Sequence, residues 1–509
     1  MPDISPSNKR IAKNTLMLYI RMLFTMLVSL YTSRVVLNTL GVEDYGIYNV
    51  VGGIISMFAF VNSAMVSSTQ RYLNFSLATG NETKLRSVFS TSLQIHALIA
   101  LVIIILGETA GLWFLKEKLV IPESRMTAAM WVYQCSIAVC AVNIMSAPFN
   151  ADIIAHEKMS AFAYISILDV TLKLAIVFLL TLSPCDKLIA YALLLLCVQI
   201  LITGIYAGYC LRHFPESHYK AEWNKPLYRE MFGFAGWSFF GNMAVALYTQ
   251  GLNMMLNIFF GPVVNAARGI AVQVQSAVQQ FVNGFQTAIS PQITKTYAVG
   301  DLAHMHTLMF RSARFSFLLL YFLSLPILLE TDFLLRIWLK TVPENAVIFT
   351  QIMICISLIY TTANPCVKAN QATGKVKAYQ LVVGGTLLTI IPISYVVLKL
   401  GAPAYSVFIV HFCVESIAQF LRMFMLKDLI HLPVKSYLKN IYIPVVSTVA
   451  VSVLLPVLVR MQFDEGWLRF IIVGFTCVIS VGLCAMFLGL TRLEREFFRD
   501  KAMKILKAR

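Results

Sequence analysis

The sequence predicts an all-α polytopic membrane protein of about fourteen transmembrane helices, and three observations lead to this fold class. Hydrophobic residues make up 58% of the 509 residues and charged residues only 13%, roughly half the charged fraction of a typical soluble protein. Apolar segments of the ~20 residues needed to cross a bilayer recur along the chain. The intervening loops alternate in their content of Lys and Arg. These features exclude a disordered chain, a secreted disulfide scaffold and a large globular catalytic domain.

Fourteen apolar segments, separated by short loops, are predicted to cross the membrane. The basic N-terminus leads into a long apolar run without a small-residue cleavage site, so we interpret this run as the first helix and not as a signal peptide. The predicted spans cover residues 15–38, 44–68, 88–112, 126–147, 159–182, 187–211, 232–258, 263–289, 312–335, 345–365, 377–399, 402–425, 440–460 and 467–490.

The distribution of basic residues predicts the orientation of the chain. One set of alternate loops, in which we count Arg314 and Arg422, carries 28 of the 41 Lys and Arg residues. By the positive-inside rule these loops are cytoplasmic, so both termini are cytoplasmic and the number of helices is even. The tail, residues 491–509, interleaves apolar with basic residues. It is typical of an amphipathic helix on anionic lipid, with a frayed solvated tail as the alternative.

An internal repeat divides the chain. Pro148 and Lys158 recur 217 residues later as Pro365 and Lys375. Further matches in the same order include the pair Gly41 and Gly80 with the pair Gly261 and Gly300, and Leu30-Tyr31-Thr32 with Leu247-Tyr248-Thr249. Each copy holds six helices, so the copies share one orientation in the membrane and are expected to be related by a pseudo-two-fold axis along the membrane normal.

The repeat predicts five parts of the chain. Two six-helix bundles are followed by two additional transmembrane helices and a basic tail, as in transporters that rock two bundles around a central site. The predicted parts are an N-terminal bundle at 1–212, a cytoplasmic linker at 213–230, a C-terminal bundle at 231–427, the two additional helices at 428–490, and an amphipathic cytoplasmic tail at 491–509.

The eighth predicted span is unusually polar. At 100° per residue, Arg268, Gln275, Gln279 and Gln286 fall within about 40° of one another, with Asn283 adjacent. Unsatisfied amides in hydrocarbon each cost several kcal/mol, so this stripe cannot face lipid. It either holds partner helices together or lines a water-filled cavity, and we favour the cavity.

Other polar residues lie on the neighbouring or repeat-related helices. Asn242 and Asn253 lie on the seventh span, and Arg21 and Arg34 on the first. Arg21 could instead extend to the cytoplasmic interface, and Arg34 and Arg268 could be interface anchors. Three arginines on pseudo-symmetric helices nevertheless indicate a cationic cavity for an anionic head group, and phosphate matches a guanidinium group.

Two further pairs of titratable residues are spaced four residues apart. Asp169 and Lys173 on the fifth span can neutralise one another, and we favour a structural pair over a role in proton or ion coupling. Glu415 and His411 on the twelfth span carry the same two alternatives. The ten cysteines form no CxxC pair, and we predict no metal, no cofactor and no catalytic residue.

Three sequence segments carry a resemblance to a known family. They are Asn-Ala-Ala-Arg-Gly-Ile-Ala at 265–271, Pro-Gln-Ile at 291–293 and Gly-Val-Glu-Asp-Tyr-Gly at 41–46. With the duplication, the chain resembles the Wzx-like polysaccharide flippases for O-antigen and capsule in the multidrug/oligosaccharidyl-lipid/polysaccharide (MOP) superfamily. The resemblance covers essentially the whole chain and implies two MATE-like pseudo-symmetric bundles plus two C-terminal helices.

The resemblance also implies a function in the bacterial cytoplasmic (inner) membrane. Such proteins move undecaprenyl-diphosphate-linked oligosaccharide from the cytoplasmic to the periplasmic leaflet by alternating access, for synthesis of O-antigen, capsule or exopolysaccharide. The implied partners are this lipid-linked oligosaccharide, membrane lipids and polysaccharide polymerase machinery, with no nucleic acid. In related lipid II flippases, arginines on helices 1, 2 and 8 contact the diphosphate. Arg21 and Arg268 occupy matching helices, whereas the second span has no arginine at mid-span.

Two other functions are alternatives to this one. A cation-coupled multidrug exporter of the same superfamily needs a carboxylate inside the bundle, and the first, second and eighth spans contain none at mid-span. A polysaccharide polymerase or ligase needs a substantial outer loop with acid and base residues, and the predicted outer loops are short. Charge complementarity therefore favours the anionic substrate of a flippase.

Overall fold

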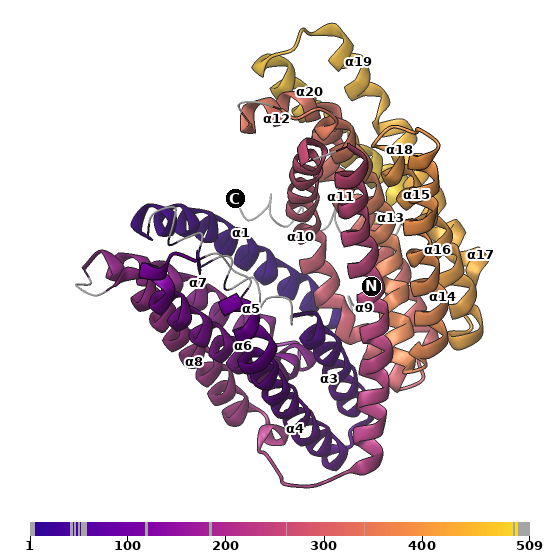
Figure 1. The fold of residues 1–509 in the computed structure, drawn as a ribbon. Coiled ribbons are helices and arrows are strands. Elements are labelled where there is room, and N and C mark those ends of the chain that lie inside the picture. Colours follow the sequence, from indigo (N-terminus) through magenta and orange to yellow (C-terminus); the bar gives the residue numbers. More distant parts are fainter. Residues whose placement is uncertain are drawn as a thin grey trace, which may run out of the picture. The chain divides into compact units, whose positions relative to one another are not determined.

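The computed structural model describes a chain built from helices (Figure 1). No strand occurs in the part of the chain that it describes. This part comprises residues 6–40, 44, 47–48, 51, 59–117, 121–182, 186–260, 262–339, 342–491 and 494–496. The segment at 41–46 named above lies largely outside this part, and the tail beyond residue 496 lies entirely outside it.

The helices form two compact units, Met1–Asn242 and Met243–Arg509. The division falls inside one long helix, α9 (Lys225–Phe260), which begins within the predicted linker. The finer boundaries predicted from the repeat stay a prediction.

Unit 1 is a bundle in which α6 packs against α4 and α8, while α1 packs against α7 (Figure 1). Its core contains the fully buried side chains of Val132, Tyr133 and Ile153. The helices described in this unit before α9 are α1 (Pro6–Leu40), α3 (Ala59–Thr79), α4 (Glu82–Leu106), α5 (Leu112–Glu117), α6 (Met126–Ala155), α7 (Met159–Leu182) and α8 (Lys187–His213).

Unit 2 is organised around α13 (Ala346–Thr373), which packs against α10, α11 and α16. The pair Phe349 and Phe408 fills the core between α13 and α16. The remaining helices are α10 (Pro262–Ala298), α11 (Leu302–Leu329), α12 (Thr331–Trp338), α14 (Val376–Leu388), α15 (Ile390–Lys399), α16 (Ser406–Ile430), α17 (Val434–Tyr437), α18 (Ile443–Ser452), α19 (Leu454–Gln462) and α20 (Trp467–Cys484).

Eleven helical segments in the described residues are long and apolar enough to cross a membrane. They correspond to eleven of the fourteen predicted spans. The other three predicted spans fall on α1, α3 and α10. In α1 the apolar stretch is shorter, Asn14–Ser29, and much of the first half of the second predicted span lies outside the described residues. The 37-residue helix α10 is long enough, but its many amides lower its hydropathy. The polytopic all-α fold class is confirmed.

The internal repeat appears in the local backbone of both units. Asn81 caps α4 by accepting a hydrogen bond from the backbone N–H of Lys84, and Asp301 caps α11 in the same way through His304. Before each cap lies a glycine in the left-handed region, Gly80 or Gly300. The same turn therefore connects α3 to α4 and α10 to α11.

A second repeated feature ends two helices. Glu157 follows α6 and Gly374 follows α13, 217 residues later, and both have a positive φ, of 59° and 76°. Pro148 and Pro365 lie inside these same helices, as the repeat predicts. At both positions the left-handed residue lets the backbone reverse direction and enter the next helix.

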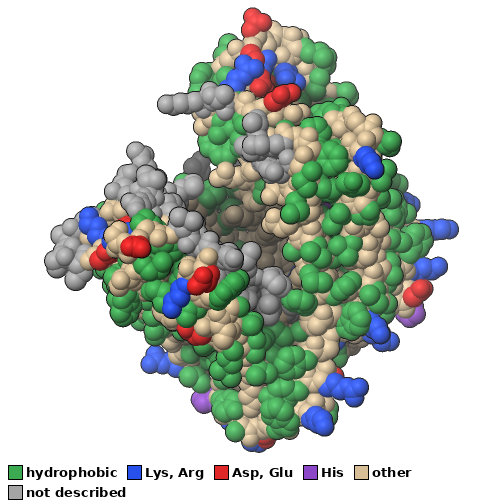
Figure 2. Space-filling model, viewed as in Figure 1, with side chains coloured by type: hydrophobic (Ala, Val, Ile, Leu, Met, Phe, Trp, Pro, Cys, Tyr) green, Lys and Arg blue, Asp and Glu red, His purple; other side chains and the backbone are tan. Residues whose placement is uncertain are grey.

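The surface of unit 2 is suited to a bilayer. Figure 2 shows hydrophobic side chains over much of the visible face near α14 to α16, with charged side chains near α12 and α19 and along the outer edge beside α17. Large apolar side chains such as Leu381, Ile393 and Val396 are exposed on this face. A soluble monomer rarely exposes so continuous an apolar surface, so it is the surface of a multi-pass membrane protein.

Two arginines that we counted with the cytoplasmic loops lie inside helices. Arg314, in α11, is 3% exposed and forms an ion pair with Glu494, and Arg422, in α16, is 2% exposed and pairs with Glu415. Each has a buried carboxylate partner, which stabilises a cation away from water, so the positions of these two arginines do not depend on the orientation of the chain.

Candidate functional site

The polar stripe of α10 separates into two faces. Gln275 donates hydrogen bonds to Ser357 Oγ at 2.8 Å and to the carbonyl of Met353 at 3.3 Å, both on α13. Gln286, only 6% exposed, donates to Ser316 Oγ on α11 and to the carbonyl of Thr361 on α13, each at 3.2 Å. These two glutamines therefore connect α10 to its neighbours, as in the alternative in which the stripe holds partner helices together.

The other face of α10 is exposed and polar. It contains Asn283, together with Gln273, Ser276 and Gln280, which lie outside the angular group formed around Arg268. Half-buried Gln279 lies beside it and is hydrogen-bonded to Asn283 at 3.5 Å. The spacing of 273, 276, 280 and 283 is itself helical, so the sequence contained the signal for this face. Large apolar side chains are absent from these positions, as expected of a face that contacts water or a polar ligand.

Packing gives the two faces different sensitivities to substitution. We expect Gln286→Leu to lower the free energy of unfolding by about 1–3 kcal/mol, because the buried acceptors on α11 and α13 lose their donor. Thermal unfolding of the purified protein in detergent measures this loss. Gln280→Leu is the matched control on the exposed face and should leave the melting temperature unchanged. Equal losses in both variants would contradict the division into two faces.

Arg268 lies half-buried near the start of α10 and is directed toward α9. Its Nη1 donates to Asn253 Oδ1 at 3.1 Å and its Nη2 to the carbonyl of Thr249 at 2.9 Å. Its Nε is buried without a hydrogen-bond partner, and in the described residues no carboxylate lies within ion-pair distance of this guanidinium. The structure thus brings together two predicted site residues, Arg268 and Asn253, in a cluster that keeps its positive charge.

The predicted site residues of unit 1 are more dispersed. Arg21 lies half-buried in α1, with its guanidinium 4.6 Å from the centre of the Phe162 ring on α7 and its Nε without a hydrogen-bond partner. Asn242 is exposed on α9, in the last turn assigned to this unit. The side chain of Arg34 lies outside the described residues. Of the arginines predicted for the site in unit 1, Arg21 is therefore the one whose side chain the structure describes.

The two predicted coupling pairs have different outcomes. Lys173 Nζ lies 2.8 Å from Asp169 Oδ2 on α7, where both side chains are partly exposed. Glu415 instead pairs with Arg422, seven residues along α16, with 2.7 Å between Oε1 and Nη1. His411, the partner considered from the sequence, packs its ring edge-on against Tyr248.

A buried carboxylate that the sequence did not single out connects the additional C-terminal helices to the bundle of unit 2. Glu330, 2% exposed at the junction of α11 and α12, pairs with Arg469 of α20 at 2.9 Å and with Arg460 of α19 at 3.6 Å. Unlike Arg268, these arginines have carboxylate partners. They are therefore structural residues and not candidates for binding an anion.

Comparison with solved structures shows that the fold is shared with MOP superfamily transporters. A multidrug resistance MATE family transporter of the MOP superfamily, in an outward-facing conformation, is 12% identical, with a TM-score of 0.72, covering 84% of this chain and 96% of that chain. A MOP superfamily transporter from Pyrococcus furiosus, described as having a binding pocket of reverse polarity that suggests a different function, is 14% identical with a TM-score of 0.67 and covers 85% and 96%. The predicted MATE-like fold is confirmed.

Sequence comparison places the chain in a family. It is 19% identical over 299 residues to the uncharacterized membrane protein EpsK of Bacillus subtilis (strain 168), a match that spans 58% of this chain and 59% of EpsK. Residues 11–297, more than half of the chain, match the family described as "Polysaccharide biosynthesis protein". The chain belongs to this family of polysaccharide biosynthesis membrane proteins.

Proposed function

We propose that this protein moves undecaprenyl-diphosphate-linked oligosaccharide from the cytoplasmic to the periplasmic leaflet of the bacterial inner membrane, with both termini in the cytoplasm. The observation that carries the proposal is the cluster at Arg268. A guanidinium that has no carboxylate partner in the described residues lies in a bundle of membrane helices, next to a polar helix face. Such a cation is costly in a bilayer unless it serves an anionic ligand.

The guanidinium of Arg268 and the polar face of α10 suit the two parts of the lipid-linked head group, which are the diphosphate and the sugars. A guanidinium binds diphosphate oxygens through charge-assisted hydrogen bonds, while the amides of Gln273, Gln280 and Asn283 can replace water around sugar hydroxyls. The polyprenyl tail would remain in lipid, because only the head needs a hydrated path. A membrane potential that is negative inside favours outward movement of the anion by about 2.3 kcal/mol per charge per 100 mV.

Charge distinguishes this proposal from export of cationic drugs. Helices α1, α3 and α10 contain no Asp or Glu over their described lengths. A cationic drug or coupling cation would find only positive charge on these helices. The membership in a polysaccharide biosynthesis family points the same way, and we place polysaccharide polymerase machinery downstream of this transport step.

The decisive test measures the lipid-linked oligosaccharide in cells with and without this protein. In a strain that has no second flippase, deletion should cause completed units to accumulate on the cytoplasmic leaflet and surface polysaccharide to disappear, and the wild-type chain should reverse both effects. An unchanged lipid-linked pool in that strain would refute the proposal. Loss of cationic dye efflux in the same strain would then support the drug exporter.

A further inference from the structure

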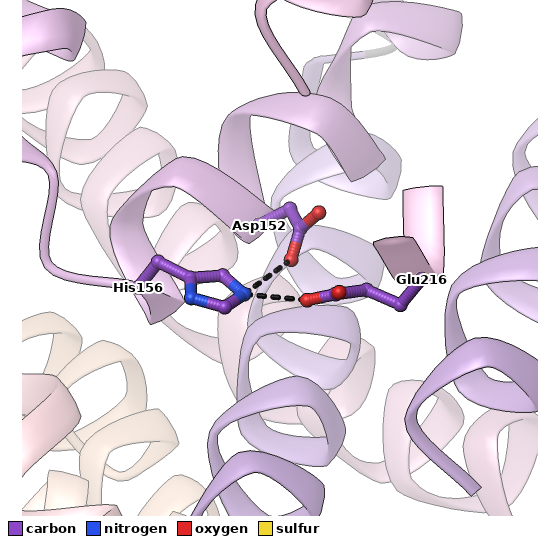
Figure 3. A group of neighbouring side chains, drawn as sticks. All are labelled: Asp152, His156 and Glu216. Atoms are coloured by element: carbon purple, nitrogen blue, oxygen red, sulfur yellow. Dashed lines mark hydrogen bonds and ion pairs between the residues drawn. The ribbon is translucent and has the colours of Figure 1, made fainter. Parts of the chain in front are cut away.

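A cluster of side chains that could bind a metal ion lies in unit 1, at the end of α6. Asp152 and His156 are four residues apart at the end of α6, so their side chains lie on one face. Glu216 comes from the short helix Pro215–Ser217 that follows α8. The potential ligand atoms of the three residues all lie within 4.8 Å of one another. Figure 3 shows the imidazole directed between the two carboxylates.

The contacts around the cluster orient each of these side chains. His156 Nε2 lies 2.5 Å from Glu216 Oε1 and 3.8 Å from Asp152 Oδ1. Its ring stacks on Phe214, with centroids 4.0 Å apart and an interplanar angle of 8°. The hydroxyl of Ser217 donates to Asp152 Oδ2 at 2.7 Å. Burial raises the pKa of Glu216, but the hydrogen bond with His156, a backbone hydrogen bond and the electrostatic interaction with His156 together outweigh burial, so the pKa of this carboxyl is lowered.

The second oxygen of Asp152 is the observation that points to a ligand. Asp152 is fully buried, and its Oδ1 has no hydrogen-bond partner in the described residues although it faces the centre of the cluster. A single imidazole between two carboxylates leaves Oδ1 without a donor in a buried position, where an unsatisfied polar atom is costly. A divalent cation between a neutral imidazole and two carboxylates would make the cluster neutral and satisfy Oδ1.

We propose that Asp152, His156 and Glu216 bind a divalent transition-metal ion, of which Zn²⁺ is the best match to one imidazole and two carboxylates. In a tetrahedral zinc site with bonds of about 2.0–2.1 Å, ligand atoms lie roughly 3.3 Å apart. The observed separations of 2.5 and 3.8 Å lie on either side of this value. The two carboxylates lie within 4.8 Å of each other, so they and the His156 ring would have to move by roughly 1 to 1.5 Å to form the site.

The position of the cluster gives the metal a structural role. Asp152 and His156 are fixed to α6, whereas Glu216 lies in the segment that leads from α8 to α9. The ion would fasten this segment to α6. This inference differs from our prediction that the chain has no metal, and it does not depend on the proposed transport function.

Zinc binding by the full-length protein tests the proposal. The protein is purified with a tag that contains no histidine, stripped with a chelator and titrated with Zn²⁺ against a competing indicator. We expect one Zn²⁺ per chain and a higher melting temperature with zinc. His156→Gln and Glu216→Gln should each weaken binding by at least about 100-fold, since even the loss of an outer-shell partner costs about 10–100-fold.

The matched control is His218→Gln. His218 is exposed, lies two residues after Glu216 and contributes nothing to the cluster. It should bind zinc as the wild type does. A wild-type protein that binds no stoichiometric zinc would show that the three residues form only a histidine–carboxylate ion pair, and zinc binding retained by both His156→Gln and Glu216→Gln would place the ion elsewhere. Either result would overturn the proposal.

Discussion

Arg268→Ala should reduce transport of the lipid-linked oligosaccharide on the order of 100-fold or more, because it removes the guanidinium that would pair with the diphosphate. Truncating one partner of a buried, hydrogen-bonded charge pair costs about 2–5 kcal/mol. The cluster would lose the only group that carries charge, while Asn253 and the carbonyl of Thr249 remain as neutral acceptors. Surface polysaccharide and the sidedness of the lipid-linked pool, compared between cells that express equal amounts of each variant, measure the effect.

Folding should change little in this variant. The two acceptors lose hydrogen bonds from a charged donor, but removal of a half-buried cation also removes its desolvation cost. The substitution leaves no described carboxylate without its cation, because none lies within ion-pair distance of Arg268. Normal transport by well-expressed Arg268→Ala would exclude a role for this guanidinium in binding the diphosphate.

Two further variants separate charge from geometry and from general effects. Arg268→Lys keeps the charge but loses the planar fork that binds two phosphate oxygens, so it should transport less than wild type and more than Arg268→Ala. Arg336→Ala removes an arginine that is exposed and already paired with Asp332. This control should transport normally.

The fold was predictable because its main determinant is a property of short segments. Each predicted span overlaps a described helix, and hydropathy over about 20 residues suffices to find such a helix. The repeat was readable for a related reason. Glycines 80 and 300 and prolines 148 and 365 occupy backbone positions that constrain residue type, so they persist in both copies while other residues differ.

The candidate site was only partly predictable, since periodicity gives the face of a helix but not what that face contacts. The angular argument grouped Gln275 and Gln286 with Arg268, yet both glutamines are bound to neighbouring helices. The exposed face, with Gln273 and Gln280, lies to the side of that group. Which face is open depends on the positions of α11 and α13, and these are set by packing over the whole unit.

Ion pairs between distant segments were not predictable for the same reason. His156 and Glu216 are 60 residues apart, and Glu330 and Arg469 are 139 apart. Spacing along one helix can suggest a pair only when both partners lie on that helix. Even there it suggested His411 for Glu415, whereas the stronger cation two turns away, Arg422, is the partner.

Glu415→Gln should lower the free energy of unfolding by about 3–5 kcal/mol, because it leaves the guanidinium of Arg422 buried without its counter-ion. The side chains of both residues are at most 4% exposed, so water cannot replace the lost carboxylate. The fall in melting temperature in detergent measures the effect. Lys173→Met is the control, since it breaks a partly exposed pair on α7 and should cost about 1 kcal/mol or less.

The double variant Glu415→Gln/Arg422→Met decides whether this pair is structural or takes part in ion coupling. Replacing both partners of a buried ion pair by neutral side chains is often close to neutral, so the double variant should be more stable than Glu415→Gln alone. We expect transport to recover together with stability, because the buried ion pair with Arg422 already neutralises this carboxylate. If the double variant is stable but its transport no longer responds to an imposed Na⁺ or H⁺ gradient, Glu415 is instead the coupling site. Arg422 would then have to release the Glu415 carboxylate during each transport cycle.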